Sequence, residues 1–181
     1  MERGSHRHKA RFLECRPVAQ PGAVACQRDL RVHQVVGNPV AGLPLTIVRL
    51  VVVADDQKRN AEDTSNRYGY QSSAGVLTRI ESTSITPATI YPGDRVDLKA
   101  TYALMAPQSD ARITVTEIRE IRFNGELVGK PEVSATHIPG TYDSNVPLFL
   151  ANDAKRGTYQ VITTIKTPEG SDARETSFTV R

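Results

Sequence analysis

The sequence contains no tryptophan, only four phenylalanines and only two cysteines among its 181 residues. A core must therefore be built from aliphatic side chains and a few tyrosines. Both cysteines, Cys15 and Cys26, lie near the N-terminus. The rest of the chain relies neither on a disulfide nor on a cysteine zinc site. Their spacing fits a Cys15–Cys26 bridge and two free thiols equally well.

Long apolar runs are also missing. The most apolar stretch, Leu43 to Ala54, contains Pro44 and Arg49 and is too short to cross ~30 Å of hydrocarbon. The basic start of the chain is not followed by an apolar segment of about 7–15 residues, as a signal peptide requires. The sequence therefore predicts no signal peptide and no transmembrane segment in this chain.

The positive charge is concentrated at the N-terminus. Residues 1–40 hold seven Lys/Arg and three Asp/Glu, whereas residues 41–181 hold sixteen and seventeen. Residues 1–40 also lack any sustained period, so we predict a disordered basic arm there. One hypothesis is that the arm is not native sequence. If it is native, it could bind nucleic acid or anionic lipid, although its scattered charges favour a solvated tail over a nucleic-acid site.

Residues 41–75 are expected to form a short strand or helix and a linker. The β-branched residues within Leu43 to Ala54 favour a strand, but the start of a helix is the alternative. Residues 55–70 are polar and suit a short exposed helix or a linker. Gly69 and Gly75 then mark a flexible joint.

From Val76 onward, apolar and polar residues alternate. Residues 96–104 and the closing stretch 159–180 keep a period of two, which is typical of half-buried strands. About seven such strands follow one another at a spacing of ~8–12 residues, each ended by Gly, Pro, Asn or Asp. The sequence therefore predicts an all-β fold: a seven-stranded, immunoglobulin-like antiparallel sandwich over residues 76–181. Pro147 predicts that its strand lies at a sheet edge or is irregular.

Two turns have strong signatures. Pro92 and Gly93 suit a type II turn, because proline fixes φ and glycine supplies a positive φ. Asn124 and Gly125 predict a two-residue hairpin, in which both residues need a positive φ.

A tyrosine follows a third turn. Tyr159 begins the penultimate predicted strand two residues after Gly157. This placement suits a tyrosine corner, in which the phenol bonds to backbone a few residues upstream, although an ordinary core tyrosine is the alternative.

Charges alternate in sign before the predicted Asn-Gly hairpin. Ile118 falls out of phase with its apolar neighbours, which predicts a β-bulge near Glu117. Glu117, Arg119, Glu120 and Arg122 suit cross-strand ion pairs on a solvated face. The alternative is a charged interaction surface formed by these four residues.

No catalytic, metal-binding or cofactor-binding motif was recognised in the sequence. His6 and His8 lie in the predicted arm, which would be a poor metal cage. His137 has Ser134 and Asp143 nearby in sequence, but nothing in the sequence orients them as a triad. We therefore expect no catalytic residue, no metal site and no cofactor.

Three segments carry a resemblance to a known family: TSITPATIYPGDRVDLKATYAL, EIRFNGELVGKPEV and AKRGTYQVITTIKTPEGSDARETSFTV. They resemble the immunoglobulin-like domains of bacterial cell-envelope proteins. In particular, residues 55–181 are similar to the C-terminal domain of Gram-negative glycine-zipper envelope lipoproteins. The resemblance implies a periplasmic or outer-membrane-associated location and no catalytic residues. It also implies a binding or spacer module whose strand edges and loops contact another envelope protein or polymer.

Overall fold

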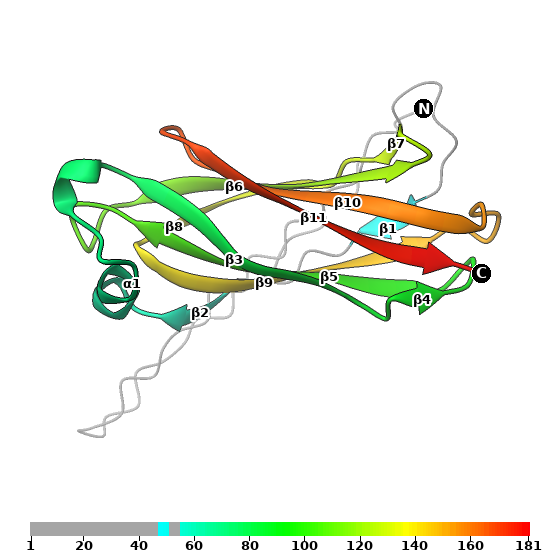
Figure 1. Ribbon diagram of the computed structural model, residues 1–181, viewed down its shortest axis with the longest axis horizontal. Coiled ribbons are helices and arrows are strands. Elements are labelled where there is room, and N and C mark those ends of the chain that lie inside the picture. The colour runs from blue at the N-terminus through cyan, green and yellow to red at the C-terminus, as the bar shows by residue number, and fades with distance from the viewer. Residues whose placement is uncertain (1–46, 51–54) are drawn as a thin grey trace, which may run out of the picture.

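The computed structural model describes residues 47–50 and 55–181. These residues form two β-sheets and one short α-helix (Figure 1). The predicted basic arm, with Cys15, Cys26, His6 and His8, lies outside the described residues. No helix within the described ranges has the length and apolar character needed to cross a membrane.

Each sheet collects strands from distant parts of the chain. The first sheet contains β1 (Ile47–Leu50), β2 (Asp56–Arg59), β3 (Leu77–Thr86), β5 (Arg95–Met105) and β9 (Gly140–Leu150). The second contains β4 (Thr89–Ile90), β6 (Ile113–Phe123), β7 (Glu126–Gly129), β8 (Glu132–His137), β10 (Gly157–Lys166) and β11 (Ser171–Val180). The remaining elements are α1 (Ala61–Tyr68) and the 3₁₀ turn η1 (Ser72–Ala74).

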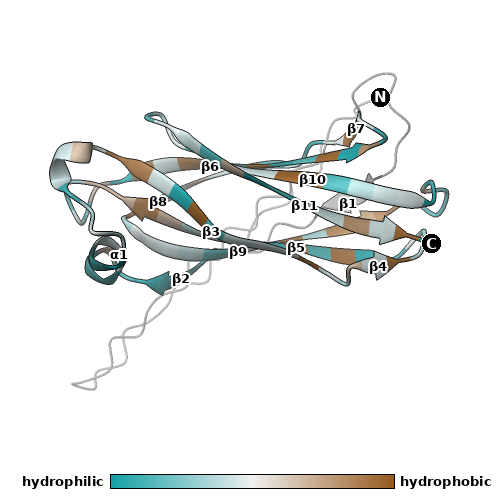
Figure 2. Cartoon of the chain, in the orientation of Figure 1, coloured by the Kyte–Doolittle hydropathy of each residue, from teal (hydrophilic) through white to brown (hydrophobic). Residues whose placement is uncertain are grey.

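The sheets pack face to face around two clusters of apolar side chains, and hydrophobic residues recur along the long strands (Figure 2). On β5, Val96, Leu98, Tyr102 and Leu104 are buried, as the period of two predicts. The mostly β, two-sheet architecture is therefore confirmed. The predicted number of strands is wrong, because residues 76–181 form nine rather than about seven. The short strands account for the difference: β4 has two residues and pairs only with the end of β11, and β7 and β8 share β6 as their partner.

Residues preceding the predicted sandwich extend the first sheet. β1 and β2 both pair with β9, and β1 confirms the predicted strand over part of Leu43 to Ala54. Helix α1 begins after Asn60, whose side chain accepts a hydrogen bond from the Asp63 amide at 2.8 Å. The helix packs on the outer face of the first sheet, where the buried Thr64 hydroxyl meets that of Thr141 at 3.0 Å.

The strand that contains Pro147 is central rather than at an edge. β9 pairs with β5 from Gly140 to Phe149 and with β1 and β2 on its other side. Pro147 lies between the residues that pair with β2 (141–143) and those that pair with β1 (148–150). For the strand as a whole the edge prediction is therefore wrong. At Pro147 itself neither short strand is paired with β9, so the proline lies at a local gap in the sheet, in keeping with the alternative of an irregular position.

The two predicted turns are present. Asn124 and Gly125 have φ values of 51° and 82° and connect β6 to β7. Gly93 has φ 87°, and the Asp94 amide donates to the Tyr91 carbonyl at 3.1 Å. These values match the predicted hairpin and type II turns.

A tyrosine at each end of the core bonds to backbone four residues upstream. The Tyr159 hydroxyl donates to the Lys155 carbonyl at 2.9 Å, as the tyrosine-corner hypothesis expects. Gly157 lies beneath this corner, where a Cβ atom would meet the Phe123 ring at 2.8 Å. Tyr142 makes an equivalent bond to the Ile138 carbonyl at 2.8 Å.

Candidate functional site

Two charged residues of β6 point into the core. Glu117 and Arg119 share the inward phase of Ile113, Val115 and Ile121, and β6 pairs with β10 without a register shift from Thr116 to Phe123. The predicted bulge near Glu117 is therefore wrong. The hydrophobic pattern was interrupted because two interior positions carry charges, whereas the strand geometry is regular.

Arg119 and Glu117 form a buried ion pair with exposures of only 1% and 6%. Arg119 Nη2 donates to Glu117 Oε2 at 2.8 Å and to Ser144 Oγ at 3.2 Å. The Ser144 hydroxyl donates to the same Glu117 oxygen at 2.6 Å. Arg119 Nε and Nη1 have no partner among residues 47–50 and 55–181. The pair thus connects β6 in the second sheet to β9 in the first.

A second set of contacts surrounds Asp55, the residue before β2. Tyr102 on β5 donates its hydroxyl proton to Asp55 Oδ2 at 2.7 Å. His137 Nε2, at the end of β8, lies 3.0 Å from the same oxygen. The His137 and Tyr142 ring centroids are 4.4 Å apart. Asp55 therefore links the segment before β2 to strands of both sheets.

The two carboxyl groups have opposite pKa shifts. Burial, together with the charge of Asp55, raises the pKa of Glu117 to about 7, against the opposing effect of Arg119. Burial alone would raise the pKa of Asp55, but hydrogen bonds from His137, Glu117 and Tyr102 outweigh it and lower this pKa. As the pH falls, the cluster therefore takes up a proton on Glu117 before Asp55.

The structure does not assemble the triad considered from sequence. His137 contacts Asp55, Ser134 bonds to Thr116 at 2.9 Å, and Asp143 accepts a bond from Thr101 at 2.6 Å. No group of three His, Cys, Asp or Glu side chains within the described ranges is placed to hold a metal ion. The contacts of Glu117, Arg119 and Asp55 join these residues to strands of both sheets. Their partners are Ser144, Tyr102 and His137.

The four predicted surface residues divide between two faces. Glu117 and Arg119 are buried, so they belong to no interaction surface, and that part of the prediction is wrong. Glu120 and Arg122 point outward and form an ion pair at 3.0 Å, with Lys130 3.5 Å from Glu120. The reason is the period of two, which sends residues 117 and 119 to one side of β6 and residues 120 and 122 to the other.

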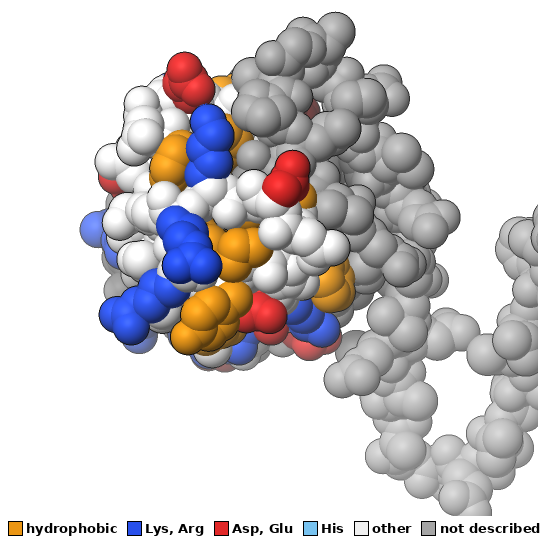
Figure 3. Space-filling model, turned by 90° about the vertical axis from the view of Figure 1, so that its right-hand side faces the viewer, with side chains coloured by type: hydrophobic (Ala, Val, Ile, Leu, Met, Phe, Trp, Pro, Cys, Tyr) orange, Lys and Arg blue, Asp and Glu red, His pale blue; other side chains and the backbone are white. Residues whose placement is uncertain are grey.

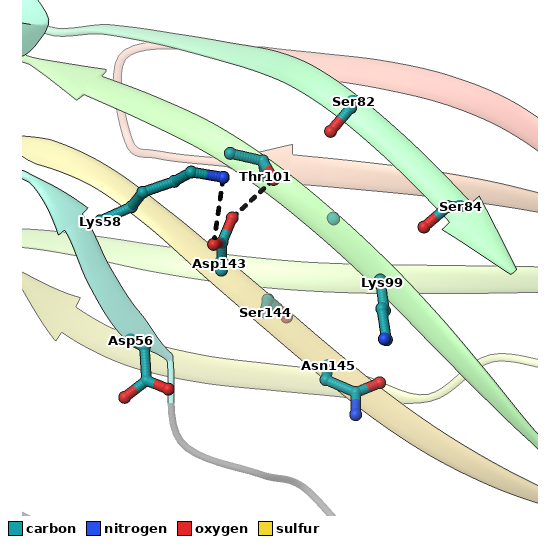
Figure 4. Close-up of a pocket in the computed structure, with 10 residues that line it drawn as sticks. Asp56, Lys58, Ser82, Ser84, Lys99, Thr101, Asp143, Ser144 and Asn145 are labelled. Carbon is teal, nitrogen blue, oxygen red and sulfur yellow. Dashed lines mark hydrogen bonds and ion pairs between the residues drawn. The ribbon is translucent and has the colours of Figure 1, made fainter. Parts of the chain in front are cut away.

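An open polar groove crosses the outer face of the first sheet (Figure 4). Its volume is about 450 Å³, and β2, β3, β5 and β9 contribute its lining. Lys58 Nζ lies 3.3 Å from Asp143 Oδ2, and Thr101 bonds to the other Asp143 oxygen. Ser84 and Lys99 line the groove from neighbouring strands. The ion pair occupies Asp143, so the groove presents mixed polar groups and no concentrated charge.

Sequence reasoning missed Asp55, Tyr102 and Ser144 as partners of the buried pair. Asp55 lies in a polar stretch with no periodic signal, so its burial has no counterpart in the sequence pattern. The signal for Glu117 and Arg119 was available, because both occupy positions that the apolar residues of β6 assign to the core.

Comparisons with known proteins assign no family. No family model matches the chain, and no curated protein matches it. Three similar solved structures are the DNA glycosylase AlkC of Pseudomonas fluorescens, a family 123 glycoside hydrolase of Clostridium perfringens and a conjugative transposon lipoprotein of Bacteroides eggerthii.

All three structural likenesses are distant. The glycosylase match has a TM-score of 0.42 at 14% identity and covers 57% of this chain and 30% of that one. The hydrolase match has a TM-score of 0.42 at 13% identity and covers 59% of this chain and 27% of that one. The lipoprotein match has a TM-score of 0.31 at 12% identity and covers 57% of this chain and 95% of that one. This chain thus spans less than a third of the first two proteins, and their activities are not transferred to it.

Proposed function

We propose that this chain is a non-enzymatic, immunoglobulin-like binding or spacer module of the bacterial cell envelope. Two facing, largely antiparallel sheets and the Tyr159 hydrogen bond to the Lys155 carbonyl support the immunoglobulin-like architecture. The cell-envelope location rests on the sequence resemblance of residues 55–181. A periplasmic or outer-membrane-associated position follows from that resemblance.

The burial of the cluster around Arg119 is the observation that carries the non-enzymatic role. Perturbed carboxyl pKa values often mark active sites, but a general acid or base must reach its substrate. Glu117 is 6% exposed, and its carboxylate contacts Arg119 and Ser144. The shifted pKa of Glu117 is therefore explained by its place in the core.

Strand edges and loops remain available for binding. β8 pairs with β6 along one side, and within the described ranges no strand pairs with its other side. Such an edge offers backbone donors and acceptors to an added strand. The partner under this proposal is another envelope protein or an envelope polymer.

The proposal is tested by photo-crosslinking the full-length protein in its native cells. A photoreactive residue at Ser134 on β8 should crosslink a partner in the envelope fraction. The same residue at Ser177, on the outer face of β11, serves as the matched control. Recovery of the protein from the cytosol alone, or equal crosslinking from both positions, would contradict the proposal.

The alternative function, binding through the basic arm, predicts a different outcome. Replacing the seven Lys/Arg of residues 1–40 with Gln removes the arm's charge and leaves the sheets unchanged. Envelope association that survives this change supports the sandwich as the binding element. Loss of envelope association, together with loss of retention on heparin, would support binding through the arm.

A further inference from the structure

Among the described strands, six lie at the edges of the two sheets. The first sheet ends in β1 and β2 on one side and in β3 on the other, and the second ends in β4 on one side and in β7 and β8 on the other. In β1, β2, β3 and β7 the register shifts by one extra residue on the edge strand. Such a bulge twists the strand and interrupts the row of backbone groups that a further strand needs, so these four edges are protected against pairing.

The edges of β3 and β4 are limited in other ways too. Side chains of β11 bind the backbone of β3: Asp172 accepts a hydrogen bond from the Ile80 amide at 2.7 Å, and Arg174 donates one to the Glu81 carbonyl at 3.0 Å. β4 has only two residues, and the end of the molecule where it lies shows Lys, Arg, Asp, Glu and hydrophobic side chains intermixed (Figure 3). Neither edge therefore offers a continuous row of backbone groups.

The β8 edge has none of these protections. Its six residues pair with β6 without a register shift, and they include neither lysine nor proline. No strand in the described part of the chain pairs with the other side of β8. Within these ranges β8 is therefore the one regular edge of more than two residues.

Every second residue of β8 directs its backbone groups outward. The Arg119 amide donates to the Pro131 carbonyl at 2.9 Å, so the backbone of residue 131 faces β6. In an antiparallel ladder the N–H and C=O of one residue point to the same side, and that side alternates along the strand. The backbone groups that point away from β6 are therefore those of Glu132, Ser134 and Thr136.

These three residues are complementary to a second copy of themselves. A twofold axis at Ser134 makes two copies of β8 antiparallel and places Glu132 opposite Thr136 of the second copy. All three outward residues are then paired, and each pair exchanges two backbone hydrogen bonds. The Glu132 carboxylate faces a hydroxyl and not a second carboxylate, which would be destabilising. On the inner side, half-buried Val133 lies opposite half-buried Ala135 of the second copy.

We propose that β8 pairs with β8 of a second copy of this chain, centred on Ser134, and joins the two six-stranded sheets edge to edge. The inference rests on the proposed function, in which the β8 edge binds a partner, and it names that partner. The twofold pair is closed, because each edge covers the other, so association stops at two copies. Pairing also covers an edge that would otherwise be a site of aggregation.

Sedimentation equilibrium of the full-length protein tests the proposal, with Ser134→Pro as the main variant. Proline removes the N–H at the centre of the pairing, and an edge strand tolerates it where that N–H points away from the sheet. The wild type should form dimers as its concentration rises, and Ser134→Pro should weaken them about tenfold or more. The matched control is Ser134→Ala, which loses only the hydroxyl bond to Thr116 and should change dimerisation less than about threefold.

Two substitutions at Thr136 test the register. Thr136→Lys places a positive charge opposite Glu132 of the second copy, twice in each dimer, and should tighten dimerisation by about 2- to 30-fold. Thr136→Glu places like charges opposite each other and should weaken it by a similar factor. Both variants keep every backbone N–H, so they test the pairing even if Ser134→Pro fails to fold.

Amide hydrogen exchange locates the pairing within β8. The Ser134 amide should exchange more slowly as the protein concentration rises, because the second copy covers it. The Ala135 amide faces β6 and should be equally protected at low and high concentration.

Three results would overturn the proposal: a full-length protein that stays monomeric at every concentration, a dimer that Ser134→Pro leaves unchanged, and equal effects of Thr136→Lys and Thr136→Glu. A monomer that crosslinks a different envelope protein from position 134 would also overturn it, but would leave the proposed function intact. Conversely, a β8 dimer recovered only from the cytosol would confirm the pairing and contradict the proposed function.

Discussion

The two halves of the core are built from different chemistry. The apolar half, nearer the C-terminus, contains Tyr159 stacked on Phe178 with ring centroids 5.1 Å apart, surrounded by aliphatic side chains. The polar half contains Tyr102 and Tyr142 beside His137, and adjoins the half-buried Asp55. Both halves lie between the same two sheets, so the fold tolerates two kinds of interior.

Arg119 and Glu117 introduce charge into this interior. An apolar core half loses stability through lost contacts and cavities, and it does so at any pH. A core that contains ionisable groups also depends on which of them carry protons. The comparison shows that one half of a sandwich can contribute stability that is independent of pH, while the other half contributes stability that depends on pH.

The largest expected effect comes from breaking the buried ion pair. Glu117→Leu leaves Arg119 without its acceptor and should lower the free energy of unfolding by about 3–5 kcal/mol at pH 8, where Glu117 is ionised. Urea unfolding followed by circular dichroism measures the change. In the apolar half, Ile121→Val should cost only about 0.5–1.5 kcal/mol.

The double variant Glu117→Leu/Arg119→Met tests whether the loss of stability comes from the arginine that is left without a partner. Removing both charges should recover most of the lost stability, because no buried charge is left without a partner. If the double variant is as unstable as the single one, the ion pair is not the cause.

The pH dependence sharpens the comparison further. The pKa of Glu117 rises from 4.5 to about 7 on folding, so the folded state binds the proton more tightly than the unfolded state. The stability contributed by this proton is fully present below pH 4.5 and is lost as the pH rises to about 7. Between pH 4.5 and pH 8 the wild type should lose on the order of 2–3 kcal/mol relative to Glu117→Gln. Parallel stability curves for the two proteins would contradict this.

A smaller effect is expected at Asp55. Asp55→Ala removes the acceptor for Tyr102 and the contact to His137, and should cost about 1–3 kcal/mol. Hydrogen exchange should accelerate first in β2, which follows Asp55 directly. The control is Lys58→Met, which removes the partly exposed ion pair with Asp143 but leaves the Thr101 bond to Asp143 in place, and it should cost less than about 1 kcal/mol. Equal losses of stability in the two variants would show that Asp55 contributes no more than a partly exposed ion pair.

The smallest effects are those of the two tyrosine hydroxyls. Tyr159→Phe and Tyr142→Phe each remove one bond to a backbone carbonyl, in the apolar and the polar half respectively. Each should cost about 0.5–1.5 kcal/mol in thermal or urea unfolding. A loss at only one of them would show that one bond lacks an energetic role.

The sequence predicted features that depend on local rules. The alternation of Val96, Leu98, Tyr102 and Leu104 follows from a strand with one buried face. The Asn124 turn follows from its need for a positive φ. These rules depend on the backbone conformation of a few neighbouring residues, so they can be applied without the partner strands.

Features that depend on distant partners were not predicted. Glu117 and Arg119 were assigned to a solvated face, because charged residues are rarely buried unless they are paired. Their partner Ser144 is on β9, and Asp55 is more than sixty residues away in sequence from Glu117. Short strands such as β4 exist only through their neighbours, which explains the strand count.

The burial of the Arg119 guanidinium is the central claim, and proton exchange measures it directly. In ¹⁵N NMR spectra, the Arg119 Nε–H should exchange with solvent as slowly as core amides, and Arg112 provides an exposed reference. Glu117→Gln should leave that protection in place, because the side chain keeps its shape. An Arg119 Nε–H that exchanges as fast as that of Arg112 would contradict the account.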